Sequence, residues 1–200
     1  MDLHFRDISN YCNLTNKIEE MNKQNIPVYL EIGFGSGIVL RDRAIKEPNV
    51  FHLGFEAQNI YIIRTEEFLK KHKIENVNLL NCDAKYIIPR FIPFESIEKI
   101  MIYYPDPWWK KKHKKYILFD LIFIGDLFRV LKKGGTINIK TDVDEYFEKI
   151  KELFNLFDYF EETPFNDKSC ETNKSTFELN AIKEGRNLNK IAYIKKGCCL

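Results

Sequence analysis

The chain has 200 residues, with 31 basic and 29 acidic side chains and a hydrophobic content of 44%. This length fits one domain with a packed core, and the hydrophobic content excludes an intrinsically disordered chain. The net charge of +2 excludes a uniformly basic protein such as a histone. However, five lysines are concentrated in the block at residues 110–115, which reads Lys-Lys-Lys-His-Lys-Lys.

The cysteines and the amino-terminal sequence bear on metals and on location. The five cysteines show no C-x-x-C spacing, so we predict no metal centre and expect reduced thiols. The first residues lack the pattern of a signal peptide, and no apolar stretch approaches the length of a membrane span. We therefore expect a soluble, cytoplasmic protein without membrane contact, whose oligomeric state, monomer or homodimer, the sequence leaves open.

Residues 1–27 are polar and weakly patterned, which predicts an N-terminal arm with room for one helix, followed by a single domain over 28–200. In that domain, short apolar runs alternate with amphipathic stretches, a pattern typical of βαβ units in an α/β fold. We predict a Rossmann-like, mostly parallel sheet with helices on both faces. The expected strands are 28–32, 51–56, 77–81, 99–103, 136–141 and 191–195, and the expected helices are 60–73, 114–131 and 143–157.

Two of these assignments depend on finer signals. The helix over 114–131 rests on apolar residues at alternating three- and four-residue steps, and Lys132-Lys133-Gly134 would supply a basic last turn and a glycine stop. The stretch 162–189, with its proline and many Asn, Ser, Thr and Lys residues, is expected to be a long surface segment.

A glycine loop follows the first expected strand in Glu31-Ile32-Gly33-Phe34-Gly35-Ser36-Gly37. Alternating glycines allow a tight turn and a close ligand contact, and the following helix offers free N–H groups. Glu56 ends the second expected strand, close to the spacing at which an acid reaches ribose hydroxyls. Asp83 follows the third strand and is either a ligand contact or a helix N-cap.

The glycine loop favours one cofactor over another. A dinucleotide fingerprint needs Gly or Ala where this chain has Ile38, which disfavours pyrophosphate binding. The acidic Glu31 beside the loop suits a ligand with an ammonium group. S-adenosylmethionine carries an ammonium group, no phosphate, and a ribose diol for Glu56, so we expect this cofactor.

A second motif, Pro105-Asp106-Pro107-Trp108, follows the fourth expected strand and precedes the lysine block. The prolines restrict the backbone around Asp106, and a neighbouring tryptophan can stack on a base. A lysine block is by itself most often a solvated surface, but here it adjoins the expected active site. Lysines in this position can hold nucleic-acid phosphates without reading sequence.

With Lys110, Lys111, His113 and Lys114, this segment resembles the signature of bacterial tRNA (guanine-N7)-methyltransferases of the TrmB type. The resemblance extends from the glycine loop through Thr141-Asp142 to Ser175-Thr176-Phe177-Glu178 and spans about residues 28–195. Two departures are Lys115-Tyr116 in place of an arginine pair, and Ser175 where threonine is usual. The family usually carries a longer, basic N-terminal extension, so the grip on tRNA at that end is expected to differ.

The resemblance implies a class I methyltransferase fold with a seven-stranded sheet. It also implies transfer of a methyl group from S-adenosylmethionine to N7 of a guanine in tRNA. In the family, this guanine is the variable-loop guanine at tRNA position 46. The resemblance further implies a catalytic role for Asp106. The implied cofactor-binding residues are Glu31, Gly33, Gly35, Gly37, Glu56, Asp83, Ala84 and Asp106, and the implied substrate-binding residues are Lys110, Lys111, Lys112, Lys114, Lys115, Asp142, Ser175, Thr176, Phe177 and Glu178.

Our mechanistic hypothesis is that Asp106, with Asp142 or Glu178, holds the Watson–Crick edge of guanine while N7 faces the methyl group. For Asp142 a structural role competes, because Asp142-Val143-Asp144-Glu145 has capping-box spacing. Three other functions stay open. They are methylation of an exocyclic amine in RNA or DNA, noncatalytic tRNA binding on the same fold, and methylation of a small molecule.

Overall fold

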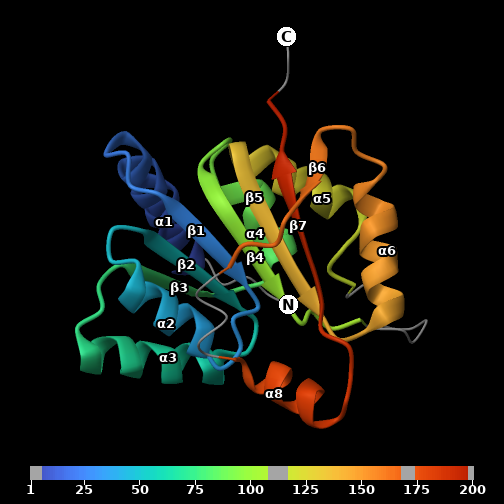
Figure 1. Cartoon of the computed structure of the whole chain (residues 1–200). Helices are drawn as coiled ribbons and strands as arrows, with labels where there is room; N and C mark the ends of the chain where they lie inside the picture. Colours follow the sequence, from blue (N-terminus) through green and yellow to red (C-terminus); the bar gives the residue numbers. More distant parts are fainter. Residues whose placement is uncertain (1–5, 108–116, 168–173, 198–200) are drawn as a thin grey trace.

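The computed structural model describes residues 6–107, 117–167 and 174–197. Its strands are β1 (Val28–Ile32), β2 (Phe51–Glu56), β3 (Val77–Asn81), β4 (Ile97–Tyr103), β5 (Leu131–Thr141), β6 (Phe160–Thr163) and β7 (Asn189–Lys195). Within the described ranges they form one seven-stranded sheet in the order β3-β2-β1-β4-β5-β7-β6 (Figure 1). The first five strands are parallel, and β7 is antiparallel to both β5 and β6. The predicted mostly parallel, seven-stranded α/β fold is confirmed.

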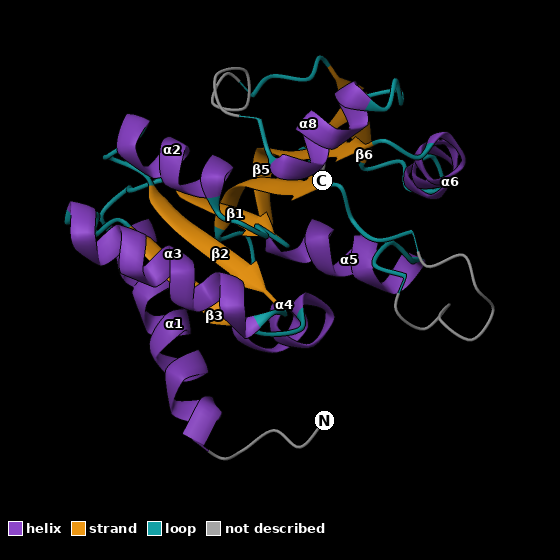
Figure 2. Ribbon diagram, turned by 90° about the horizontal axis from the view of Figure 1, so that it is seen from below, coloured by secondary structure: helices purple, strands orange, loops and turns teal. Residues whose placement is uncertain are grey.

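Helices cover both faces of this sheet (Figure 2). They are α1 (Arg6–Lys23), α2 (Ile38–Lys46), α3 (Asn59–His72), α4 (Ala84–Phe91), α5 (Leu121–Val130), α6 (Asp144–Phe154) and α8 (Thr176–Lys183). The crossovers through α2 and α3 run toward the β3 edge, whereas those through α4 and α5 run in the opposite direction. Since crossovers between parallel strands are right-handed, the two helix pairs lie on opposite faces.

The change of winding direction lies between β1 and β4, which are neighbours in the sheet. In open α/β sheets, ligands bind outside the carboxyl ends of the strands at such a point. Ile32 at the end of β1 pairs with Phe55 of β2 and with Ile102 of β4. The segments that follow these three strands therefore emerge side by side.

The core is built around β4. Ile100, Met101 and Ile102 are at most 1% exposed, as expected for a central parallel strand with helices on both faces. Helices α1, α4 and α5 pack against one face of the sheet. α1 contributes the buried residues Leu14 and Ile18 to the hydrophobic core. These two residues lie inside the predicted N-terminal arm; the domain boundary after residue 27 stays a prediction.

The helix predicted over 114–131 begins later than expected. Its first residues, 114–116, lie outside the described residues, and α5 starts only at Leu121. Asp120 is the N-cap, and its side chain accepts a hydrogen bond from the Phe123 N–H. Phe119 is buried in the core without being helical. The apolar pattern therefore begins several residues before the first residue of α5.

The predicted glycine stop of that helix is also wrong. α5 ends at Val130, and the chain enters β5 directly at Leu131. Gly134 lies inside β5 with φ of +73°, in the stretch where the pairing with β4 shifts its register. A glycine in the left-handed region here forms an irregularity of the strand.

The prediction of a surface segment over 162–189 holds only in part. Residues 176–183 form α8, and two acidic side chains in the segment, Asp167 and Glu178, are buried. β6, which overlaps the start of this segment, was absent from the predicted strands. In the part of the chain that the structure describes, none of the helices combines the length and apolar content needed to cross a bilayer.

Candidate active site

The loop after β1 holds three glycines in the left-handed conformation. φ is +73° at Gly33, +53° at Gly35 and +70° at Gly37, a region that residues with a Cβ atom rarely adopt. A Cβ atom at Gly33 or Gly35 would meet nothing within 4 Å, so their bare backbone borders open space. At Gly37 a Cβ atom would lie 2.5 Å from Oγ1 of Thr65 on α3. This third glycine is therefore needed where the loop approaches α3.

Glu56, at the end of β2, holds the glycine loop in place. Its carboxylate accepts a hydrogen bond from the Gly35 N–H at 2.9 Å and another from the Gln58 N–H at 2.9 Å. Each carboxylate oxygen has a second lone-pair site, so these bonds leave acceptor capacity for a ligand hydroxyl. The structure brings Glu56 and the glycine loop together, and the predicted contact of Glu56 with ribose hydroxyls stays a prediction.

Asp83 caps α4, which begins at Ala84. The Asp83 carboxylate accepts a hydrogen bond from the Lys85 N–H at 2.9 Å. The N-cap interpretation of Asp83 is therefore confirmed, and its cofactor contact, like that of Ala84, stays a prediction. Both residues follow β3, next to the strand that ends in Glu56.

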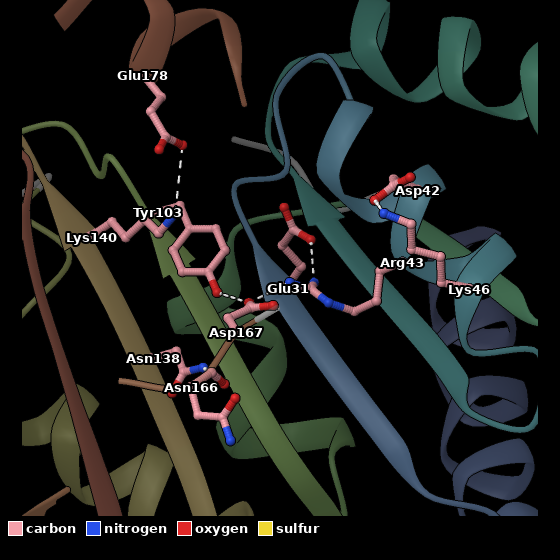
Figure 3. A network of polar contacts seen from close by, with 10 residues as sticks. All are labelled: Glu31, Asp42, Arg43, Lys46, Tyr103, Asn138, Lys140, Asn166, Asp167 and Glu178. Atoms are coloured by element: carbon pink, nitrogen blue, oxygen red, sulfur yellow. Dashed lines mark hydrogen bonds and ion pairs between the residues drawn. The ribbon is translucent and has the colours of Figure 1, made fainter. Parts of the chain in front are cut away.

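Glu31 belongs to a buried charge cluster that the sequence did not indicate (Figure 3). Nη1 of Arg43, a fully buried arginine on α2, lies 3.0 Å from Oε2 of Glu31. The other terminal nitrogen, Nη2, lies 2.5 Å from Oδ2 of Asp167. Burial raises the pKa of Glu31 to about 7, while the Arg43 guanidinium counteracts part of that rise. Two buried carboxylates thus share one guanidinium.

Asp167 connects this cluster to β4. The phenol of Tyr103, the last residue of β4, donates a hydrogen bond to Oδ2 of Asp167. Asp167 lies 124 residues after Arg43 in the chain. The cluster therefore fastens the segment after β6 to the carboxyl ends of β1 and β4.

A cavity of about 270 Å³ lies next to this cluster. Lys140, near the end of β5, and Glu178, on α8, line it with Nζ and Oε2 3.6 Å apart. The Lys140 ammonium also lies 5.2 Å from the centre of the Tyr103 ring and 5.6 Å from that of Phe165. Asp167 lines the same cavity, so the cavity and the buried cluster are continuous. The sequence predicted Glu178 as a site residue but gave no indication of Lys140.

Asp106 lies on the segment that follows β4. Its side chain is exposed, and the preceding Tyr104 has φ of +54°, which is uncommon for a residue with a side chain. The Tyr104 N–H donates to the carbonyl of Lys140 at 2.8 Å. This bond fixes the start of the Pro105-Asp106-Pro107 segment beside the end of β5. Strained backbone of this kind is typical of functional segments.

Asp142 does not cap a helix as its spacing suggested. α6 begins at Asp144, and its N-cap is Val143, which has no side chain able to cap. The Asp142 carboxylate instead forms an ion pair with Arg186. The competing capping interpretation of Asp142 is therefore wrong, and its substrate contact stays a prediction.

The Ser175–Glu178 motif forms the start of α8. Ser175 is the N-cap, and its hydroxyl accepts a hydrogen bond from the Glu178 N–H at 3.1 Å. The Phe177 side chain is 57% exposed, whereas Glu178 is 7% exposed. Within this motif, Thr176 is the first residue of the helix. The motif thus directs Glu178 inward and Phe177 outward.

The predicted substrate-binding lysines of the block lie outside the described residues. The same holds for Trp108 and Trp109. Their predicted roles therefore stay predictions. The lysines in question are Lys110, Lys111, Lys112, Lys114 and Lys115.

Comparison with known proteins gives the following matches. The family model Methyltransf_4, described as "Putative methyltransferase", matches residues 25–193. The tRNA (guanine-N(7)-)-methyltransferase of Thermotoga maritima is 28% identical over 159 residues, which cover 80% of this chain and 51% of that protein. The protein of the same name from Neisseria meningitidis serogroup C is 32% identical over 139 residues, which cover 70% of this chain and 58% of that protein. The chain thus spans only a little over half the length of these relatives.

Among solved structures, the 30S ribosomal A1408 methyltransferase from an uncultured bacterium matches with a TM-score of 0.60 and 17% identity, covering 90% of this chain and 93% of that chain. At this level of identity the likeness shows the fold alone. It confirms the Rossmann-like methyltransferase fold that the sequence motifs led us to expect.

Proposed function

We propose, since the chain belongs to the tRNA (guanine-N7)-methyltransferase family, that it transfers a methyl group from S-adenosylmethionine to N7 of a guanine in tRNA. The finer proposal is that this guanine is the one at position 46 in the variable loop. We also propose that the catalytic, cofactor-binding and substrate-binding residues are those predicted from the sequence.

One observation carries the proposal. The glycine loop, Glu56 and the Asp106 segment lie at the carboxyl ends of three strands, β1, β2 and β4, that are neighbours in the sheet. A cofactor held by the first two would thus lie beside the third, as methyl transfer requires. The lysine block continues from the third segment and supplies charge for tRNA phosphates.

The residues at the loop suit S-adenosylmethionine. The backbone at Gly33 and Gly35 borders open space, and the Glu56 carboxylate has acceptor sites left for the ribose hydroxyls. Arg43 contacts Oε2 of Glu31, and an ionised carboxylate can accept further hydrogen bonds from the ammonium group of the cofactor. When bound, the cofactor supplies the methyl group, whose bond to sulfur breaks as the bond to N7 forms, with the electron pair passing to sulfur.

The chemistry asks for positioning and charge rather than for a strong base. Guanine N7 has an in-plane lone pair and no proton to remove, so alignment with the methyl group is the main requirement. The methylated purine is cationic, and a carboxylate beside it stabilises the charge that develops. Asp106, on its strained segment, is the residue that we assign to this task.

Incubation with S-adenosylmethionine and unmodified tRNA, followed by nucleoside analysis, tests the proposal. We expect N7-methylguanosine as the product. N6-methyladenosine would indicate an exocyclic-amine methyltransferase instead. Cofactor binding without any methylated nucleoside, or no binding at all, would remove the proposal in favour of a noncatalytic tRNA-binding protein.

A further inference from the structure

The Lys140–Glu178 pair is buried, but its two charged groups are not in close contact. Lys140 is 8% exposed and Glu178 is 7% exposed, yet their nearest charged atoms are 3.6 Å apart, beyond a good hydrogen bond. Within the described part of the chain, neither head group completes a hydrogen bond to another protein atom. Buried charged groups with so few partners are costly unless a ligand or water satisfies them.

Both head groups line the cavity of about 270 Å³, together with the aromatic side chains of Tyr104 and Phe165. The ammonium offers hydrogen-bond donors and the adjacent carboxylate offers acceptors. The flat rings supply surface on which a base can stack. The cavity thus places the Lys140 donor group next to the Glu178 acceptor group, beside aromatic walls. Asp167, Lys174, Asn189 and Lys190 also line it.

This pair is complementary to one nucleobase edge. The Watson–Crick edge of guanine presents the O6 acceptor, then the N1–H and 2-amino donors. Adenine presents an amino donor in place of O6 and an acceptor at N1, so its polarity is reversed. A buried site that must hydrogen-bond a substrate strongly rejects an analogue that leaves its groups unpaired.

We propose that Lys140 is a specificity-determining residue that donates a hydrogen bond to O6 of the target guanine, while Glu178 accepts from N1–H and the 2-amino group. This inference rests on the proposed function, because it assumes that guanine is the base that enters the cavity. It adds to the family motif a residue on β5 that the motif does not contain.

The orientation that results agrees with the rest of the site. In guanine, O6 and N7 are adjacent on the same edge of the base. If O6 contacts Lys140, N7, the atom to be methylated, lies beside that contact. Lys140 lies on the Tyr103 side of the pair, and Tyr103 leads through Asp167 and Arg43 to Glu31 beside the glycine loop (Figure 3). N7 is thereby turned toward the proposed cofactor site.

The test uses three tRNA molecules that differ only at the methylated position. They carry guanine, 2,6-diaminopurine or hypoxanthine (the base of inosine). In 2,6-diaminopurine an amino group replaces O6 and N1 has no hydrogen, whereas hypoxanthine keeps O6 and N1–H and lacks only the 2-amino group. For each, kcat/KM for methyl transfer is measured, and binding is measured separately without cofactor. We expect the wild-type protein to prefer guanine over 2,6-diaminopurine by about 100-fold or more.

Lys140→Met should reduce this preference at least about tenfold and leave the preference for guanine over hypoxanthine unchanged. Lys140→Arg should retain both preferences, because it keeps the positive charge and N–H donors. Lys132→Met is the matched control, since Lys132 lies at the other end of β5 and pairs with Glu98 at 2.8 Å. If Lys140→Met does not fold, Lys140→Gln replaces it, with an intermediate loss of preference expected.

Two results distinguish failure of the Lys140 inference from failure of the proposed function. If the guanine preference over 2,6-diaminopurine survives in Lys140→Met, or falls together with the preference over hypoxanthine, Lys140 does not read O6 and the inference is overturned. If the wild-type protein transfers no methyl group but shows the binding preference, and Lys140→Met reduces that preference, the proposed function fails while the assignment of Lys140 as the O6 donor is supported.

Discussion

Replacing Arg43 by methionine should destabilise the protein strongly, and more so at alkaline than at acidic pH. Arg43 is fully buried and is the guanidinium shared by Glu31 and Asp167. Methionine fills much of the same volume but leaves two buried carboxylates without this cation. Breaking a buried ion pair by removing one partner typically costs about 3–5 kcal/mol, and we expect a loss of unfolding free energy in this range at pH 8.

The pH dependence follows from Glu31. Burial raises its pKa from 4.5 to about 7, so the native state binds this proton more tightly than the unfolded state does. The corresponding stability is fully present below the unfolded pKa and is lost as the pH rises through 7, an effect of about 3 kcal/mol for this group. In Arg43→Met the pKa should rise further, because the guanidinium that lowers it is gone. At pH 5.5 the variant can therefore keep Glu31 neutral and should lose less stability.

Urea unfolding of the wild-type protein and the variant at pH 5.5 and pH 8 measures both effects. Arg64→Met, which removes an exposed arginine on α3, is the control and should change the unfolding free energy by no more than about 0.5 kcal/mol. A loss for Arg43→Met that is the same at both pH values, or below about 1 kcal/mol at pH 8, would refute the reasoning.

Three further predictions concern the proposed site. Gly37→Ala should weaken S-adenosylmethionine binding at least about tenfold in calorimetry, because Gly37 has φ of +70° and a Cβ atom there would lie 2.5 Å from Thr65. The control is Gly125→Ala in α5, where a Cβ atom meets nothing within 4 Å; it should leave the affinity unchanged and stabilise the fold by about 0.5–1 kcal/mol. Equal affinities in the two variants would contradict this prediction. Asp106→Asn should lower kcat about 100-fold at unchanged cofactor affinity, and a wild-type rate would exclude the proposed role. Replacing the five lysines of residues 110–115 by glutamine should flatten the salt dependence of tRNA binding, whereas an unchanged slope would place the phosphate contacts elsewhere.

The sheet was largely predictable from the sequence because each of its parallel strands contains a short apolar run. The bounds of β1, β2 and β3 agree with the predicted ranges. β6 escaped prediction because it has four residues, of which Glu161 and Glu162 are exposed. The start of α5 was misplaced because apolar residues that pack as an irregular segment keep a helical spacing up to Asp120.

Site residues that lie at the ends of predicted strands could be predicted from the sequence. Site residues that depend on a side-chain contact with a residue far away in the chain could not. The glycines and Glu56 follow expected strands, so topology alone brings them together. Arg43 looks in sequence like a solvent-facing charge on a helix, and its partner Asp167 lies 124 residues away. Lys140 likewise sits in a strand pattern that says nothing of the residue facing it on α8.

The most direct test of the proposed function is strand scission at N7-methylguanine in tRNA treated with the protein and S-adenosylmethionine. We predict one cleavage site, at the variable-loop guanine, that forms about 100-fold more slowly when Asp106→Asn replaces the wild-type protein under the same conditions. Absence of scission with the wild-type protein, despite measurable cofactor and tRNA binding, would contradict the proposal that this chain is a guanine-N7 methyltransferase.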